Sequence, residues 1–99
     1  MNTNILVTGC GGEIGYCIGK ILKKYNNITC YGCDITDFHP GKYFFKDCFV
    51  VPRADEIKYL SKLEDIVKLY NITLIIPSNE SEIDVFHKKN FKLCNKTRF

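Results

Sequence analysis

The chain has 99 residues, of which 45% are hydrophobic, and this length allows one domain with a thin core. No run of 18 apolar residues occurs, so no membrane-spanning helix is predicted and no membrane partner is expected. Residues 1–4 lack the basic start and long apolar stretch of a signal peptide, which favours a cytoplasmic location.

The net charge of +3 is unevenly distributed along the chain. Residues 1–86 carry 9 basic and 11 acidic side chains, whereas residues 87–99 carry five basic and no acidic ones. A short basic terminus is more often a solvated end than a nucleic-acid contact. We therefore predict a Rossmann-like domain over residues 1–86 and a basic tail, or the start of a missing region, over residues 87–99. A nucleic-acid partner is not expected.

The first half of the chain alternates a strand pattern with a helix pattern. Residues 4–8 are apolar and β-branched and predict a buried strand, which ends at a glycine-rich turn. A helix is predicted from residue 14, with Ile14, Cys17, Ile18, Ile21, Leu22 and Tyr25 on one apolar face. Residues 28–33 predict a second strand, with Asp34 at its carboxyl end.

The second half repeats this alternation after a long loop. Residues 34–46 predict a loop, and residues 48–51 predict a third strand. Asp55 is expected to cap the next helix. A fourth strand is predicted over residues 72–76 and a short helix over residues 82–89. The apolar stripe of the middle helix is expected to comprise Tyr59, Leu60, Leu63, Ile66, Val67 and Tyr70.

Buried apolar strands that alternate with amphipathic helices are typical of a parallel sheet covered on both faces. The fold class is therefore predicted to be α/β, a Rossmann-like three-layer domain with a parallel sheet of about four strands.

Cysteine and histidine give little indication of a metal site. Cys30 and Cys33 have the spacing of a zinc knuckle, but no second pair completes four ligands, and residues three apart in a strand face opposite ways. Neither His39 nor His87 has a ligand partner at metal-binding spacing. We therefore expect buried, reduced cysteines and no metal ligands.

The strongest local motif lies between the first strand and the first helix: Thr8-Gly9-Cys10-Gly11-Gly12-Glu13-Ile14-Gly15. Glycines permit a tight turn, and the start of a helix offers unpaired N–H groups to an anion. The motif fits TGxxGxxG, which is typical of extended short-chain dehydrogenases and sugar-nucleotide epimerases. Asp34 stands where such folds hold a ribose. An NAD(P)-binding domain is therefore one hypothesis.

Three features weigh against a dinucleotide site. Glu13, in the opening turn of the helix, would repel a pyrophosphate. Tyr16 and Lys20 match a catalytic Tyr-x-x-x-Lys pair by letter, but they lie beside the glycine turn rather than far down the chain. The fourth strand ends in polar residues, where an epimerase would place small ones against the cofactor.

Six segments that together cover about residues 4–86 carry a family resemblance: residues 5–15, 31–35, 40–43, 47–52, 59–60 and 74–82. In the order and spacing of these segments, the chain resembles the pre-ATP-grasp domain of carbamoyl-phosphate-synthase-like ATP-grasp enzymes. Its glycine turn, which carries Glu13, Ile14 and Gly15, is also similar to that of the N-terminal domain of formate-dependent glycinamide ribonucleotide transformylase.

The resemblance implies a substrate-side domain of an ATP-dependent carboxylate–amine or carboxylate–thiol ligase, in which an acyl phosphate is attacked by a nucleophile. ATP and magnesium would bind to ATP-grasp lobes that are missing here. The chain itself would then hold no catalytic residue and no cofactor, and it would be inactive alone. The implied partners are those lobes, a small-molecule acceptor and, in a homo-oligomer, a second copy of the chain. The residues implied to line the acceptor side are Gly9, Gly11, Gly12, Glu13, Gly15, Asp34 and Glu80. A stand-alone sensing or docking domain is a third hypothesis.

Overall fold

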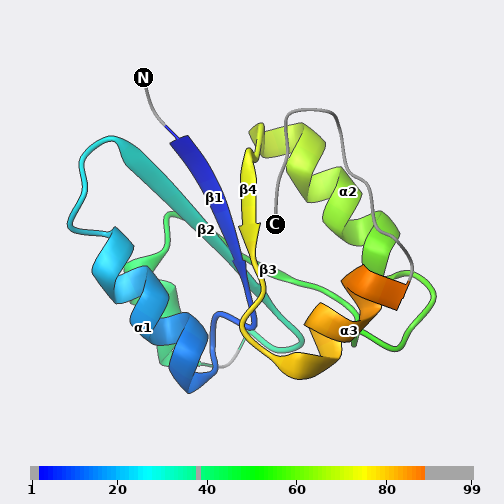
Figure 1. Ribbon diagram of the computed structural model, residues 1–99. Helices are drawn as coiled ribbons and strands as arrows, with labels where there is room; N and C mark the ends of the chain where they lie inside the picture. The colour runs from blue at the N-terminus through cyan, green and yellow to red at the C-terminus, as the bar shows by residue number, and fades with distance from the viewer. Residues whose placement is uncertain (1–2, 38, 89–99) are drawn as a thin grey trace.

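The computed structural model describes residues 3–37 and 39–88, and most of the predicted basic tail lies outside these ranges. Its centre is a four-stranded parallel sheet with the strand order β3-β2-β1-β4 (Figure 1). The predicted α/β, Rossmann-like class is therefore confirmed. In chain order the elements are β1 (Thr3–Thr8), α1 (Glu13–Leu22), β2 (Ile28–Asp34), the 3-10 helix η1 (Pro40–Phe44), β3 (Cys48–Val50), α2 (Tyr59–Tyr70), β4 (Leu74–Ile76) and α3 (Glu80–Lys88).

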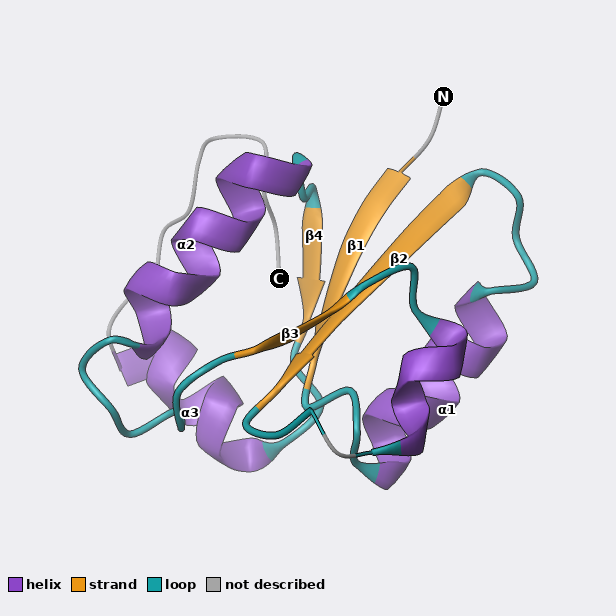
Figure 2. Ribbon diagram, turned by 180° about the vertical axis from the view of Figure 1, so that it is seen from behind, coloured by secondary structure: helices purple, strands orange, loops and turns teal. Residues whose placement is uncertain are grey.

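The helices cover the sheet from both sides, which gives three layers (Figure 2). Ile5 and Val7 of β1 face α1 and η1, whereas Leu6 between them faces α2 and α3. Cys30 and Cys33 likewise enter opposite cores, as their spacing predicts. Because β1 lies between β2 and β4 and is buried on both faces, it carries an uninterrupted apolar run.

The packed face of α1 agrees only in part with the predicted one, of which Ile18 and Leu22 pack against the core. Ile14, Cys17 and Ile21 are exposed, and Gly15 and Gly19 are buried instead. A side chain is excluded at both glycines: a Cβ at Gly15 would lie 2.3 Å from the Gly9 carbonyl oxygen, and one at Gly19 would lie 2.4 Å from the Phe45 ring. The helix therefore docks through these glycines as well as through apolar side chains, and a search for apolar periodicity does not detect the glycines.

The start of α2 also departs from the prediction. The helix begins at Tyr59, and Asp55 lies in the preceding turn, where its carboxylate is 3.7 Å from Nε of Arg53. The residue before the helix is Lys58, which makes no side-chain capping bond. The predicted apolar stripe is confirmed, because its members are buried or packed against the core. None of the helices in the described part of the chain has the length and apolar character needed to cross a bilayer.

Replacement of Gly15 by alanine tests whether α1 is anchored through its contact with the glycine turn. The new methyl group would collide with backbone atoms of Gly9 and Cys10, which cannot move away as a flexible side chain could. We expect Gly15→Ala to lower the free energy of unfolding by about 3 kcal/mol, the upper end for overpacking, in urea titrations followed by circular dichroism.

The matched control is Gly12→Ala in the same turn, where the nearest atom to a new Cβ is 3.4 Å away. Its cost should stay below about 1 kcal/mol. Equal losses from the two substitutions would contradict this packing account.

Candidate functional site

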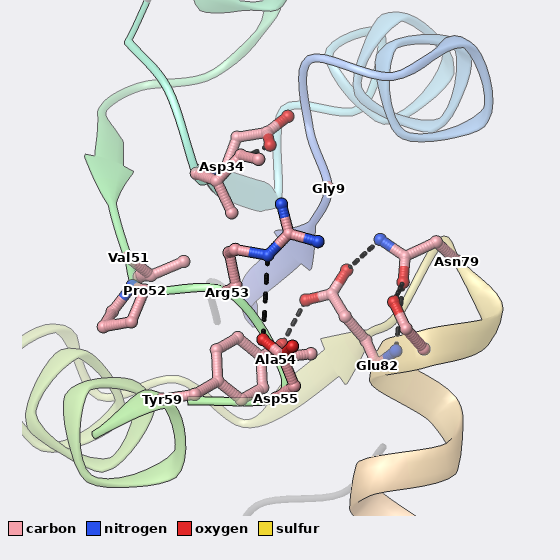
Figure 3. A pocket seen from close by; sticks show the side chains of 12 residues that line it. Gly9, Asp34, Val51, Pro52, Arg53, Ala54, Asp55, Tyr59, Asn79 and Glu82 are labelled. Atoms are coloured by element: carbon pink, nitrogen blue, oxygen red, sulfur yellow. Dashed lines mark hydrogen bonds and ion pairs between the residues drawn. The ribbon is translucent and has the colours of Figure 1, made fainter. Parts of the chain in front are cut away.

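A pocket of about 240 Å³ opens at the carboxyl edge of the sheet (Figure 3). Each strand contributes a lining residue at or just after its carboxyl end: Gly9, Asp34, Val51 and Asn79. In open α/β sheets, ligands bind at this edge where the chain changes direction across the sheet. In this sheet the chain runs from β1 to β2 and β3 on one side of β1, and it then crosses back so that β4 pairs with β1 on the other side. The pocket therefore lies at the topological switch point.

The Asp34 carboxylate ties the end of β2 to the glycine turn. Its Oδ2 accepts a hydrogen bond from the backbone N–H of Gly11 at 2.8 Å, and its Oδ1 accepts one from the N–H of Ile35 at 2.7 Å. Gly11 is required for this approach, since a Cβ there would lie 2.7 Å from Asp34 Oδ2. Both carboxylate oxygens of Asp34 thus accept hydrogen bonds from the protein backbone, although this carboxylate stands where related folds bind a ribose.

The glycine turn uses its own N–H groups internally. Besides the Gly11 N–H, the N–H of Cys10 donates to the carbonyl of Cys33 at 3.0 Å, and the N–H of Gly12 donates to the carbonyl of Gly9 at 3.0 Å. Gly9 adopts φ = 67°, a left-handed conformation suited to glycine. Three consecutive donors are therefore already paired, and the turn does not present them to an anion.

The residues implied by the family resemblance lie in different environments. Gly9 and Asp34 line the pocket, and Gly11 contacts Asp34. Gly12 and Glu13 are exposed at the start of α1, and Gly15 is buried under the turn. The remaining residue, Glu80, is exposed at the start of α3 and does not line the pocket.

The carboxyl group that does enter the pocket from α3 is Glu82, which sequence reasoning missed. Its side chain is 5% exposed, and its Oε1 accepts a hydrogen bond from Nδ2 of Asn79 at 2.6 Å. Its Oε2 accepts a hydrogen bond from the hydroxyl of Tyr59, and its backbone N–H donates to Oδ1 of Asn79 at 3.0 Å. The spacing Asn79-x-x-Glu82 is that of a capping box, and this signal is visible in the sequence.

Burial alters the acid–base properties of this pair. Loss of hydration raises the pKa of Glu82 above its ordinary value of 4.5, although the hydrogen bonds from Tyr59 and Asn79 oppose the shift. Burial and the neighbouring carboxyl group also raise the pKa of Tyr59. Burial at the pocket floor therefore shifts the protonation equilibrium of Glu82 toward its neutral form relative to a glutamate in water.

The cysteines fall into two groups. Burial raises the pKa of Cys30 to about 12 and that of Cys33 well above its ordinary value, so both thiols are unreactive core residues, as expected. A hydrogen bond with Cys48 and burial raise the pKa of Cys10 as well. The second group is set apart by position, because Cys10, Cys48 and His39 place potential metal-ligating atoms within 4.8 Å of one another. Their separation along the chain conceals this cluster from any search for sequence spacing.

Protonation of Glu82 should make stability depend on pH. Because its folded-state pKa is raised above 4.5, the folded chain binds this proton more tightly than the unfolded chain does. The contribution of Glu82 to the free energy of unfolding is therefore greatest at pH below 4.5 and falls as pH rises through the folded-state pKa. A tenfold difference in proton affinity between the folded and unfolded chains is worth about 1.4 kcal/mol.

We expect Glu82→Gln, which stays neutral at every pH, to remove this decline in urea titrations repeated across the pH range. Glu80→Gln, an exposed substitution in the same helical turn, serves as the control and should leave the decline intact. The interpretation fails if Glu82→Gln and the unaltered chain lose stability equally as pH rises.

Comparison with proteins of known sequence and structure reveals similarity to two groups. The chain is 33% identical over 70 residues to the bifunctional polymyxin resistance protein ArnA of Wigglesworthia glossinidia brevipalpis, which covers 71% of the chain but 11% of that protein. Among solved structures, dTDP-glucose 4,6-dehydratase of Bacillus anthracis in complex with NAD gives a TM-score of 0.58 at 24% identity, over 86% of this chain and 29% of that one. Glycinamide-RNase-transformylase T of Mycobacterium tuberculosis gives a TM-score of 0.64 at 11% identity, over 88% of this chain and 26% of that one.

These structural similarities show a shared fold, and the chain spans less than a third of each of these proteins. A match to a family description is more specific. Residues 5–96 match the family described as PylC-like, N-terminal domain, so the match covers nearly the whole chain. The expected resemblance to a pre-ATP-grasp domain is thereby confirmed. The chain belongs to the PylC-like N-terminal domain family.

Proposed function

We propose that this chain is the acceptor-substrate side of a cytoplasmic, ATP-dependent carboxylate–amine or carboxylate–thiol ligase, and that it is inactive by itself. ATP and magnesium would bind to ATP-grasp lobes supplied by another part of the protein. There a carboxylate would be converted to an acyl phosphate, which the acceptor nucleophile attacks with release of phosphate. The role of this chain would be to hold one substrate at the carboxyl edge of its sheet.

The observation that carries the proposal is the internal pairing of the glycine turn. A dinucleotide site needs backbone donors free to meet a pyrophosphate. In this chain the N–H groups of Cys10, Gly11 and Gly12 all have protein acceptors. A pyrophosphate that used the Gly11 N–H would have to displace the Asp34 carboxylate, and one placed at the start of α1 would meet the negative charge of Glu13.

The charges in the pocket support the same conclusion. Its lining includes the carboxyl groups of Asp34, Asp55 and Glu82 but one basic side chain, Arg53. Figure 3 shows the Arg53 side chain directed into the pocket between Asp34 and Glu82. Even with Glu82 neutral, the carboxylates outnumber the guanidinium group, which disfavours a diphosphate and suits an acceptor that bears an amine.

A second candidate function is an NAD(P)-binding domain of an extended short-chain dehydrogenase or sugar-nucleotide epimerase. It is favoured by the TGxxGxxG spacing and by the position of Asp34 at the end of β2. The similar dehydratase structure is described as a complex with NAD. This candidate requires the turn to open and Asp34 to turn toward a ribose.

Calorimetric titration of the chain with NAD⁺, NADH, NADP⁺ and NADPH separates the two candidates. Because the donors of the turn are paired and its surroundings are acidic, we expect no binding in the micromolar range. The B. anthracis dehydratase is the positive control. Micromolar binding that is lost in Asp34→Ala would overturn the ligase proposal in favour of the dinucleotide site.

The ligase activity itself is tested in the full-length protein that carries this chain. We expect ADP release that depends on both a carboxylate and an amine or thiol. Arg53→Ala, which removes the one basic side chain of the pocket lining, should lower the KM for an amine acceptor while leaving the KM for ATP unchanged, and Glu80→Gln, outside the pocket, should change neither. Absence of acceptor-dependent ADP release, or an effect of Arg53→Ala on ATP alone, would contradict the proposal.

A further inference from the structure

Three side chains that can bind a metal converge on the face of the sheet that packs against α1, and none of them lines the pocket described above. They are Cys10 in the glycine turn, His39 before η1 and Cys48 at the start of β3. Their ligand atoms all lie within 4.8 Å of one another, and Cys10 Sγ is 3.8 Å from His39 Nε2. Cys10 is completely buried, whereas His39 and Cys48 are half-buried.

Two glycines create the space that these donors occupy. Gly32 of β2 pairs with Cys48 in the ladder, and a Cβ at Gly32 would lie 2.7 Å from Cys10 Sγ. Gly11 does the same for the imidazole, since a Cβ there would lie 2.6 Å from His39 Cγ. The cluster therefore brings together segments that are distant in sequence, and it depends on the absence of side chains at Gly11 and Gly32.

The spacing suits a tetrahedral ion. Zinc lies about 2.3 Å from a thiolate and about 2.0–2.1 Å from an imidazole nitrogen, so neighbouring tetrahedral ligands are about 3.6–3.8 Å apart. The 3.8 Å between Cys10 Sγ and His39 Nε2 is about 0.2 Å longer than the sulfur–nitrogen value of about 3.6 Å, and the 4.8 Å limit on the other pairs leaves at most about 1.2 Å to close. Two thiolates with one imidazole form a donor set that prefers zinc to magnesium or calcium.

The imidazole of His39 is enclosed by the protein but not fully hydrogen-bonded to it. Its Nδ1 atom is buried and has no hydrogen-bond partner within the described ranges. An unsatisfied buried nitrogen is costly, and an ordered water is a common reason for one. Because Nε2 is the nitrogen that lies near Cys10 Sγ, an ion in the cluster would bind Nε2, and Nδ1 would still need such a water.

We propose that Cys10, His39 and Cys48 bind one Zn²⁺ ion, with a water molecule as the fourth ligand. Binding converts two thiols to thiolates and releases two protons to solvent, with no change of oxidation state. The two thiolates balance the charge of the ion while His39 stays neutral. Asp34 is not needed as a ligand, because its oxygens are held by Gly11 and Ile35.

Such an ion would fasten the glycine turn to the loop before η1 and to the edge strand β3. It would stabilise the fold and hold the turn in its paired conformation, whichever function the pocket serves. The inference therefore stands independently of the ligase proposal.

The test uses the whole chain, reduced and stripped of metal, titrated with Co²⁺ as a spectroscopic probe and with Zn²⁺ against a chromophoric chelator. We expect one ion per chain, thiolate-to-cobalt charge-transfer absorption in the near ultraviolet, release of two protons and a higher melting temperature. Zinc should also protect the half-buried Cys48, but not the exposed Cys17, from alkylation followed by mass spectrometry. This protection needs no substitution that could unfold the chain.

Cys48→Ser and His39→Ala should each weaken zinc binding by more than about 100-fold, because loss of an outer-shell partner alone typically costs about 10–100-fold. Cys17→Ser is the matched control and should bind as the unaltered chain does. The proposal is overturned if the chain does not bind zinc, or if the cobalt spectra lack charge-transfer bands. It is also overturned if binding survives Cys48→Ser, or if Cys10 and Cys48 form a disulfide that resists the reducing agent.

Discussion

The hydrogen bond from the Gly11 N–H to the Asp34 carboxylate is the interaction on which the rest of the site depends. It joins the end of β2 to the turn that follows β1, and it requires a bare Cα at position 11. Together with the bond from the Cys10 N–H to the Cys33 carbonyl, it sets the path of the turn and the point where α1 begins. A protein carboxylate thus occupies one of the backbone donors of the glycine turn.

The fold of this chain does not by itself identify its function, and the hydrogen bond between Gly11 and Asp34 belongs to the site rather than to the shared fold. Its sheet resembles that of an NAD-containing dehydratase and that of a transformylase to similar degrees, with TM-scores of 0.58 and 0.64. Such folds host unrelated chemistries, so the distinction has to come from the site. Paired turn donors and an acidic pocket are the features of this site from which we propose an acceptor-side role rather than a dinucleotide site.

Much of the fold could be predicted because parallel strands buried on both faces have a simple sequence pattern. The alternation of β1, α1 and β2 follows from the apolar run at residues 4–8 and the change of period after it. The packed face of α1 could be predicted only in part, because Gly15 and Gly19 dock by lacking side chains rather than by being apolar. The helix start at Tyr59 was also misplaced, because Asp55 has the chemistry of a cap but pairs with Arg53.

The site was less predictable than the fold, because its groups meet only in three dimensions. Asp34 could be placed at a strand end by sequence, but its engagement with Gly11 depends on how tightly the turn closes. Glu82 was overlooked because a glutamate early in a helix is normally solvated, whereas Tyr59 from α2 covers this one. The donors Cys10 and His39 are 29 residues apart, far from any ligand spacing found in sequence motifs.

The most direct test of this account is the chemical shift of the Gly11 backbone amide in NMR spectra of the chain. If Asp34 holds that amide, its proton should resonate downfield, move upfield in Asp34→Ala, and stay unchanged when pyrophosphate or NAD⁺ is added. An amide that ignores the loss of Asp34 and shifts with added pyrophosphate would show an open anion site, and it would contradict the central claim.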